Sequence, residues 1–227
     1  MVQTKVFSAE VEITVKGGAL SAKNRVVEQL REAIYKGILK PGDELAQQKI
    51  SEQLGVSRIP VRDAFAVLEH AGLVEANTSN RMVVKKITPE QIFDDLELRI
   101  MLEGLIVKKA TLRGRMSTFE ELEHINAEMD RAAAENDGDA FKTLNSCFHH
   151  KIWEMAGNPR LLRIMEDLWF AMPFYYPVAS PGEFFINTGE HWEMIKAMKE
   201  RRPDDASKIS EQHIERMKQR LMNRLYK

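Results

Sequence analysis

The chain has 227 residues and a formal net charge of −1, with 44% hydrophobic and 30% charged residues. This length allows two domains of ordinary size, and the composition is typical of a soluble globular protein. No apolar run approaches the roughly 20 residues of a membrane span, and no signal-peptide pattern opens the chain, so we expect a cytoplasmic protein without a membrane partner. The single cysteine, Cys147, excludes an internal disulfide, and we expect it to be a small buried residue.

Residues 1–19 have no helical period, and we expect them to form a flexible amino-terminal arm. A helix is predicted over residues 21–36, because apolar side chains recur there at the spacing of one helix face. These side chains are Val26, Leu30 and Ile34. Gly37 suits the position just past the end of this helix.

Residues 50–72 predict two helices with a tight turn between them. Ile50 and Leu54 lie one turn apart in the first helix, and Gly55 allows the turn. The second helix carries one apolar stripe and runs to Gly72. The stripe consists of Val61, Ala64, Phe65 and Leu68. This pattern is that of a helix-turn-helix, which delivers the first turn of its second helix to the edges of DNA bases.

Two arginines stand at the start of the second of these helices. Arg58 and Arg62 lie one turn apart and away from the apolar stripe, so both guanidinium groups face outward. Ser57, just before them, is a favourable N-cap. Taken alone, two arginines at this spacing are also typical of an ordinary solvent-exposed helix face. A hairpin predicted over residues 73–84 follows, and three helices with a hairpin form the winged variant of this motif, which favours DNA binding.

Three sequence motifs occur in this region. Pro41-Gly42-Asp43-Glu44-Leu45 precedes the two helices, Gly55-Val56-Ser57-Arg58-Ile59-Pro60-Val61-Arg62 joins them, and Gly72-Leu73-Val74 follows. With these motifs, residues 20–86 closely resemble the GntR family of bacterial winged-helix repressors. The resemblance implies a winged helix-turn-helix domain over residues 20–87 that binds an operator in double-stranded DNA.

The resemblance also implies which residues contact DNA. Arg58 and Arg62 match the two DNA-reading arginines of the family, and a guanidinium fork fits guanine O6 and N7 or a phosphate. Gln48 replaces a common arginine, and the wing tip lacks the usual glycine, so Asn80 would have to make that turn. The implied DNA-binding residues are Ser57, Arg58, Arg62, Gln48, Lys49, Asn80 and Arg81.

Charge is distributed unevenly along the chain. Up to Thr88 there are 13 Lys and Arg against 10 Asp and Glu, a net charge of +3, and the remainder holds 20 against 24, a net charge of −4. This mild basic bias predicts moderate affinity for DNA per subunit. Two copies would supply the missing affinity, so we expect a homodimer on a near-palindromic operator.

Residues 88–227 predict an all-α domain of six helices, which makes the whole chain mainly α. A capping box at Thr88-Pro89-Glu90-Gln91 opens the first helix, which runs to about Arg113, and a second at Ser117-Thr118-Phe119-Glu120 opens the next. The four later helices are expected over residues 139–156, 159–172, 183–201 and from 203 onward.

Three histidines lie on apolar faces of three of these helices. They are His149, one turn after Asn145, and then His191 and His213. A single inward histidine is more often a hydrogen-bonded core residue than a metal ligand. Three buried imidazoles each need a polar partner, however, and one shared divalent ion would satisfy all of them.

The spacing Asn145-x-x-x-His149, followed by His191 and His213, resembles the FadR-type (FCD) domain of the GntR family, and six helices match its VanR-like subgroup. The resemblance implies a divalent metal ion, zinc or similar, held by Asn145, His149, His191 and His213. Asparagine stands where the family has aspartate, so the site is less negative. A site that uses the histidines directly on an anion is the alternative.

The FCD resemblance further implies a small organic acid as effector, bound through its carboxylate at the metal. The implied effector-binding residues are Arg99, His149, His191 and His213. Arg99 also lies one turn from Glu103, and the plain interpretation of that pair is an intrahelical ion pair worth about 0.3–0.5 kcal/mol. Residues 88–227 are thus expected to bind the effector and to dimerise.

These patterns predict a transcription regulator, by family habit a repressor, rather than an enzyme. Three neutral ligands with open positions are also the layout of catalytic zinc, so a metal-dependent enzyme acting on small organic acids, with a DNA-binding head, is the alternative. Against it, the chain has no His-Glu-x-x-His helix and no nucleophile motif. A third hypothesis is a purely structural helical domain that serves dimerisation.

Overall fold

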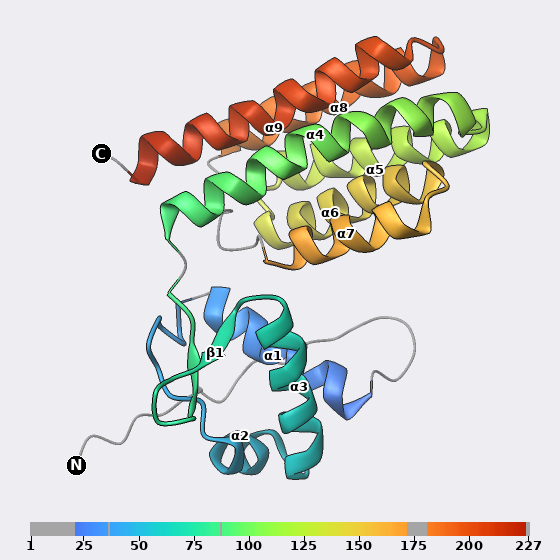
Figure 1. Cartoon of the computed structure of the whole chain (residues 1–227). Coiled ribbons are helices and arrows are strands. Elements are labelled where there is room, and N and C mark those ends of the chain that lie inside the picture. The colour runs from blue at the N-terminus through green and yellow to red at the C-terminus, as the bar shows by residue number, and fades with distance from the viewer. Residues whose placement is uncertain (1–20, 36, 87, 172–180, 226–227) are drawn as a thin grey trace. The chain divides into compact units, whose positions relative to one another are not determined.

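The computed structural model of the chain describes residues 21–35, 37–86, 88–171 and 181–225. The chain divides into two compact units, Met1–Thr88 and Pro89–Lys227 (Figure 1). The arm expected over residues 1–19 lies outside the described residues.

The first unit contains three helices and a two-stranded antiparallel sheet. These elements are α1 (Ala22–Tyr35), α2 (Gln47–Leu54), α3 (Arg58–His70), β1 (Val74–Ala76) and β2 (Met82–Val84). Val74 pairs with Val84 and Ala76 with Met82, and an isolated bridge joins Glu44 to Val83. The apolar stripes of α1 and α3 pack against each other in the core of this unit. The winged helix-turn-helix predicted from the sequence is confirmed.

Two of the residues with a left-handed backbone conformation form the turn between α2 and α3 and the tip of the hairpin. Gly55 ends α2 with φ 62°, which gives the sharp exit toward α3 without a steric penalty. Asn80 takes φ 56° at the hairpin tip, as its short polar side chain allows. Ser57 occupies the N-cap position of α3, as predicted, although its side chain makes no capping hydrogen bond.

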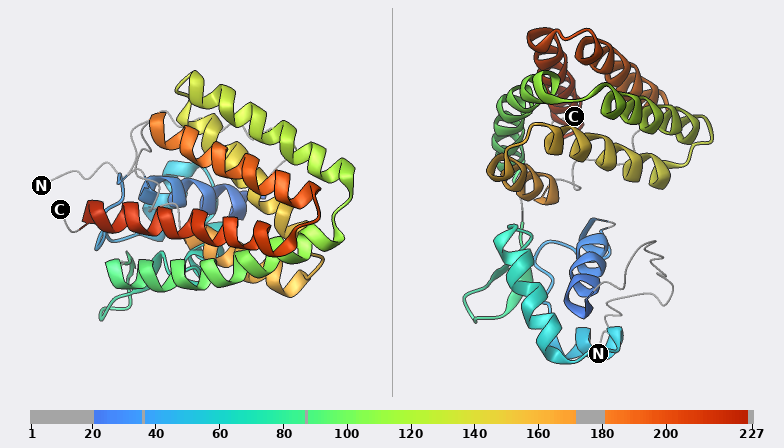
Figure 2. Two further views of the ribbon diagram at one scale, coloured as in Figure 1. Left: turned by 90° about the horizontal axis from the view of Figure 1, so that it is seen from above. Right: turned by 90° about the vertical axis from the view of Figure 1, so that its right-hand side faces the viewer.

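Six helices make up the described residues of the second unit, as predicted. They are α4 (Pro89–Arg113), α5 (Met116–Ala134), α6 (Gly138–Met155), α7 (Pro159–Ala171), α8 (Pro181–Lys199) and α9 (Pro203–Leu225). The two long helices α4 and α9 pack along each other, while α5 packs against α6 and α8 (Figures 1 and 2). One apolar core, rich in Phe, Met and Ala side chains, fills the bundle.

Two arginine side chains donate hydrogen bonds to carbonyl groups at the carboxyl-terminal ends of α4 and α6. Arg201 donates from Nη2 to the carbonyl oxygen of Gly114 at 2.8 Å and lies over the ring of Phe119. Arg113 donates from Nη1 to the carbonyl oxygen of Ala156 at 2.6 Å. Since the last carbonyl groups of a helix have no partner within the helix, these contacts satisfy acceptors that would otherwise be buried unpaired.

Two local predictions in this unit are wrong. Helix α5 begins at Met116 with Arg115 at its N-cap, so Ser117 lies inside the first turn and forms no capping box. Cys147 is exposed rather than buried, because it lies on the solvent-facing side of α6 beside the inward-facing Phe148. No helix among the described residues has both the length and the apolar content that crossing a bilayer requires.

Candidate metal centre and DNA interface

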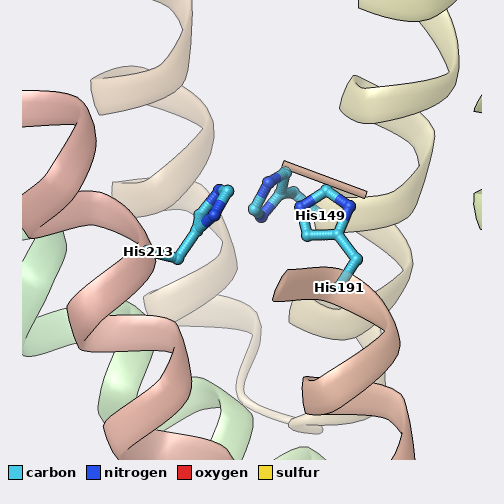
Figure 3. Close-up of side chains that lie close together, drawn as sticks. All are labelled: His149, His191 and His213. Carbon is cyan, nitrogen blue, oxygen red and sulfur yellow. The ribbon is translucent and has the colours of Figure 1, made fainter. Parts of the chain in front are cut away.

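Three histidines from three helices meet in the interior of the second unit. His149 comes from α6, His191 from α8 and His213 from α9, and all three are buried. One nitrogen of each ring lies within 4.8 Å of the corresponding nitrogens of the other two (Figure 3). Nitrogen ligands that bind one ion at about 2.1 Å lie roughly 3–4 Å from one another. A small movement of the three side chains would therefore bring their nitrogens close enough to share one ion.

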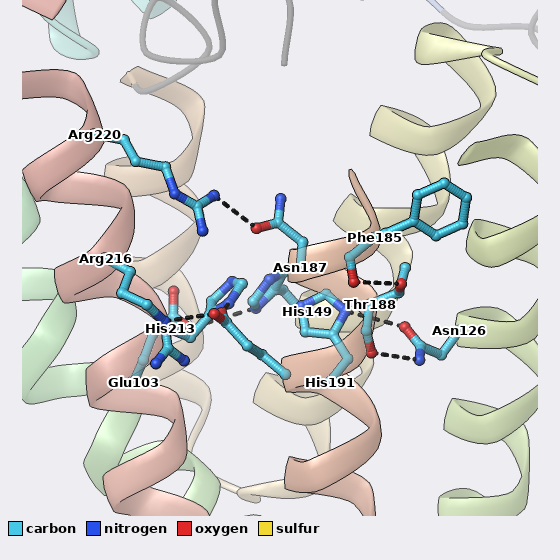
Figure 4. Close-up of polar contacts among 11 residues, drawn as sticks. Glu103, Asn126, His149, Phe185, Asn187, Thr188, His191, His213, Arg216 and Arg220 are labelled. Carbon is cyan, nitrogen blue, oxygen red and sulfur yellow. Dashed lines mark hydrogen bonds and ion pairs between the residues drawn. The ribbon is translucent and has the colours of Figure 1, made fainter. Parts of the chain in front are cut away.

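Each of these rings has an oxygen atom beside its Nδ1 (Figure 4). The Nδ1 of His149 lies 3.4 Å from Oε2 of Glu103 on α4. The Nδ1 of His191 lies 3.2 Å from Oδ1 of Asn126 on α5. The Nδ1 of His213 lies 2.5 Å from Oε2 of Glu190 on α8. Oxygen acceptors at Nδ1 favour the tautomer that carries its proton there, which leaves the Nε2 lone pair free to bind a cation.

The Nε2 atoms of His149 and His191 are buried and have no hydrogen-bond partner within the described part of the chain. A buried polar atom without a partner costs free energy, so these two lone pairs fit a bound cation better than an apolar interior. Asn145, one turn before His149 on α6, is buried as well. The residues present therefore fit a divalent metal ion with nitrogen ligands.

The electrostatic surroundings of His149 and His191 favour their neutral forms. Burial lowers the pKa of His191 well below its usual value, and the neighbouring His213 and His149 lower it further. Burial also lowers the pKa of His149, although Glu103 opposes the shift. Metal ligands must be deprotonated, so this environment favours metal binding over protonation.

Arg99 and Glu103 form an ion pair on α4 that is buried, not exposed on the helix surface. Arg99 Nε donates to Glu103 Oε1 at 2.9 Å, and the Arg99 guanidinium lies 4.7 Å from the centre of the Trp169 ring. Burial would raise the pKa of Glu103, but Arg99 and His149 outweigh it and hold the pKa at about 2. The value expected for an exposed intrahelical pair is therefore wrong for this site, because no solvent screens the two charges.

Glu190 has a comparable environment on α8. Arg216 Nε lies 2.5 Å from Oε1 of Glu190, whose other oxygen contacts His213. Burial would raise the pKa of Glu190, but the hydrogen bond from His213 and the charge of Arg216 lower it overall. Each carboxylate beside a histidine is thus paired with an arginine.

The outward face of α3 carries the predicted DNA-reading arginines. Arg58 and Arg62 are both exposed. The Nη2 of Arg62 lies 3.1 Å from Oδ1 of Asp63, and both side chains remain largely in solvent. An exposed ion pair of this kind is weak, so Arg62 can exchange Asp63 for a phosphate or a base. Gln47 Nε2 donates to the carbonyl oxygen of Arg58 at 2.6 Å and ties α2 to the start of α3.

The other predicted contacts lie at the start of α2 and on the wing. Gln48 and Lys49 are exposed, and Gln48 Nε2 donates to Oε1 of Glu52 at 3.0 Å. Arg81, beside the hairpin tip, forms an exposed ion pair with Glu44 at 2.9 Å. The structure thus places every predicted DNA-binding side chain at the surface of the first unit.

Both units of the chain match known protein families. Residues 94–216 match the FCD domain, and residues 22–84 match the model of bacterial regulatory proteins of the gntR family. The chain is a GntR-family transcription regulator with an FCD domain.

The relatives of this GntR regulator are of similar length. It is 25% identical over 189 residues to the HTH-type transcriptional regulator YdhC of Bacillus subtilis, covering 82% of this chain and 83% of YdhC. It is 26% identical over 191 residues to the transcriptional repressor RspR of Escherichia coli, covering 82% of each chain. The solved structure of E. coli McbR has the same fold, with a TM-score of 0.78 at 21% identity, covering 91% of this chain and 100% of that one. These relatives are transcription regulators, and none of the three is described as an enzyme.

The sequence does not predict three residues that lie beside the candidate metal ligands. These are Asn126, Glu190 and Glu103, of which Glu103 is expected only as the partner of Arg99. A signal existed for Asn126, because it is a polar residue within the apolar stripe of α5, between Leu122 and Met129. No comparable signal marked Glu190, since acidic residues beside a histidine are common on helix surfaces.

Proposed function

We propose that this GntR regulator is a dimeric repressor that binds a near-palindromic operator and releases it when a small carboxylate binds at a divalent metal in the FCD domain. The observation that carries the proposal is the trio His149, His191 and His213, each with an oxygen atom beside its Nδ1. A purely structural helical domain has no need for three such buried imidazoles in one place.

The metal site would be held by the three histidines, with Asn145 as a fourth ligand through its amide oxygen. Nitrogen ligands suit zinc and similar ions. The bound ion would supply positive charge and open coordination positions for a carboxylate. Glu103, Asn126 and Glu190 orient the imidazoles and fix their tautomers.

An anion site that uses the histidines directly is less favourable here. Direct attraction of an anion would need protonated imidazoles, but burial lowers the pKa of His191 and His149. Arg99, the predicted effector contact, is paired with Glu103 at 2.9 Å. A bound metal ion would supply the missing positive charge, which favours a metal site over a site in which the histidines bind the anion directly.

On the DNA side, α3 would enter the major groove with Arg58 and Arg62 at base edges or phosphates. Gln48, Lys49 and Ser57 would contact the backbone, and Asn80 and Arg81 on the wing would approach the minor groove. The relative RspR of E. coli is a transcriptional repressor, which supports repression as the mode of action.

Effector control requires that the carboxylate bind one arrangement of the protein better than the other. The three histidines come from α6, α8 and α9, so an ion and an effector would draw three helices toward one point. A change in the positions of these helices is the route by which the FCD domain would alter operator binding.

His191→Ala tests the proposal. The variant should bind at most one tenth of the zinc of the parent by elemental analysis, and small organic acids should no longer release it from operator DNA in a fluorescence anisotropy assay. His124→Ala, an exposed histidine on α5, is the matched control and should behave like the parent. His191→Gln provides a second variant with a polar side chain, in case the alanine variant does not fold. Equal zinc content in folded variant and parent would refute the metal site.

A further inference from the structure

Helix α3 presents an isoleucine at the centre of its outward face. Ile59 lies in the first turn of the helix and exposes 62% of its surface. Successive residues of a helix are rotated by about 100°, which places Ile59 within about 20° of the direction opposite to the buried stripe of α3. Arg58 and Arg62 lie to one side of that direction. Ile59 therefore points away from the core more directly than either arginine does.

The position of Ile59, more than its exposure, indicates a contact. Single exposed apolar residues are common on protein surfaces and need no explanation. Ile59, however, stands in the turn that a helix-turn-helix presents to the edges of bases. The hydrogen bond from Gln47 Nε2 to the carbonyl oxygen of Arg58, at 2.6 Å, holds the backbone of this turn against α2. The branched side chain of Ile59 also has few rotamers, so a contact would cost it little conformational freedom.

The chemistry of the major groove limits what this side chain can contact favourably. Isoleucine offers no hydrogen-bond donor or acceptor. Guanine, adenine and cytosine present polar groups in the major groove, and these would lose water beside an alkyl group without gaining a partner. Thymine also presents a C5-methyl group, which is the one apolar group on the edges of the four bases in this groove. An alkyl side chain against that methyl group removes apolar surface of both from water.

We propose that Ile59 reads a thymine in each half-site of the operator through contact with its C5-methyl group. The inference rests on the proposed function, because it requires α3 to enter the major groove. It goes further by adding a base preference that Arg58 and Arg62 do not carry. Where a guanidinium fork reaches a base it favours guanine, so the half-site would combine guanine with a thymine within the same few base pairs.

Removal of single methyl groups from the operator tests this contact on the full-length protein. The operator would be selected by the parent from random double-stranded DNA, and its affinity measured by fluorescence anisotropy at fixed salt. Deoxyuridine then replaces each thymine in turn, which removes the methyl group and keeps the base pair. One position in each half-site should show about fourfold weaker binding, the loss expected for one methyl group that is no longer buried. At that position, 5-methylcytosine should bind more tightly than cytosine by a similar factor.

Three variants assign the methyl preference to Ile59. Ile59→Ser removes the alkyl group and should bind the thymine and deoxyuridine operators equally well. Ile59→Val keeps a branched alkyl side chain and should keep the preference for thymine. Ile38→Ser is the matched control, because Ile38 is an exposed isoleucine of the first unit outside α3, and it should also keep the preference. Circular dichroism would verify that each variant is folded.

Two results would overturn the inference and leave the proposed function standing. The first is an operator that the parent binds specifically but that contains no methyl-sensitive thymine. The second is a methyl effect of the same size in Ile59→Ser, which would trace it to the shape of the DNA instead of a contact with this residue. Failure of the parent to select any sequence would instead refute the proposed operator binding, and the inference with it.

Discussion

Arg99 and Glu103 show how much burial changes the meaning of a short sequence pattern. One turn apart on an exposed helix, such a pair would contribute a few tenths of a kcal/mol. Here both side chains are almost completely buried, and Glu103 also contacts Nδ1 of His149 at 3.4 Å. The pair therefore connects the stability of α4 to the orientation of a metal-ligand candidate.

Glu103→Gln should lower the free energy of unfolding by about 3 kcal/mol, because it removes the carboxylate that neutralises the buried guanidinium group of Arg99. Chemical denaturation in the presence of a chelator would measure this loss without a contribution from metal. Glu128→Gln is the control, since Glu128 pairs with Arg131 at 2.8 Å on the outside of α5. The control should lose about 0.5 kcal/mol or less. Equal losses in the two variants would contradict the role assigned to the buried pair.

At the level of elements, helix α3 has two faces with separate tasks. Val61, Ala64, Phe65 and Leu68 face the core, while Arg58 and Arg62 face solvent. The core face holds the helix through apolar packing, and the exposed face is available to DNA. A substitution on the exposed face can therefore change DNA binding without changing the fold.

Arg62→Ala should weaken specific operator binding by roughly ten- to a hundredfold per half-site, the loss expected for one bidentate contact. Its melting temperature should match that of the parent, because the ion pair with Asp63 is exposed and weak. Arg131→Ala removes the same charge from an exposed position on α5 and should bind operator normally. Anisotropy titrations at fixed salt would decide, and an unchanged affinity of Arg62→Ala would remove this residue from the interface.

At the scale of the whole molecule, the division into two units determines which part of the chain a bound metal can stabilise. Each unit has its own apolar core, and the candidate metal ligands all belong to Pro89–Lys227. A ligand that binds only the folded form of one unit stabilises that unit alone. The metal should therefore act on the helical unit first, and on DNA binding only through it.

Zinc should raise the temperature of one calorimetric transition, that of the helical unit. At a free metal concentration of 100 times the dissociation constant, the gain is about 2.7 kcal/mol, which corresponds to a shift of several degrees. The transition of the first unit should remain where it is when a chelator replaces the metal. Scanning calorimetry of the full chain would show this, and a joint shift of all heat absorption would mean instead that the two units unfold together.

Local patterns along the chain were enough to predict the helices, the hairpin and their order. Helical periodicity placed His149, His191 and His213 on inward faces, because a buried stripe on a helix follows from local spacing alone. Motif resemblance located the winged helix-turn-helix, including the left-handed turn at Asn80. These features depend on neighbours within a few residues in the chain.

Only the tertiary structure decided what surrounds those side chains. Asn126 and His191 are 65 positions apart and Glu190 and His213 are 23 apart, yet each pair is in contact. Such partners depend on how whole helices are rotated and shifted against one another, and helical periodicity carries no information about that packing. The same packing buried Arg99, one turn from its acidic partner on the same helix.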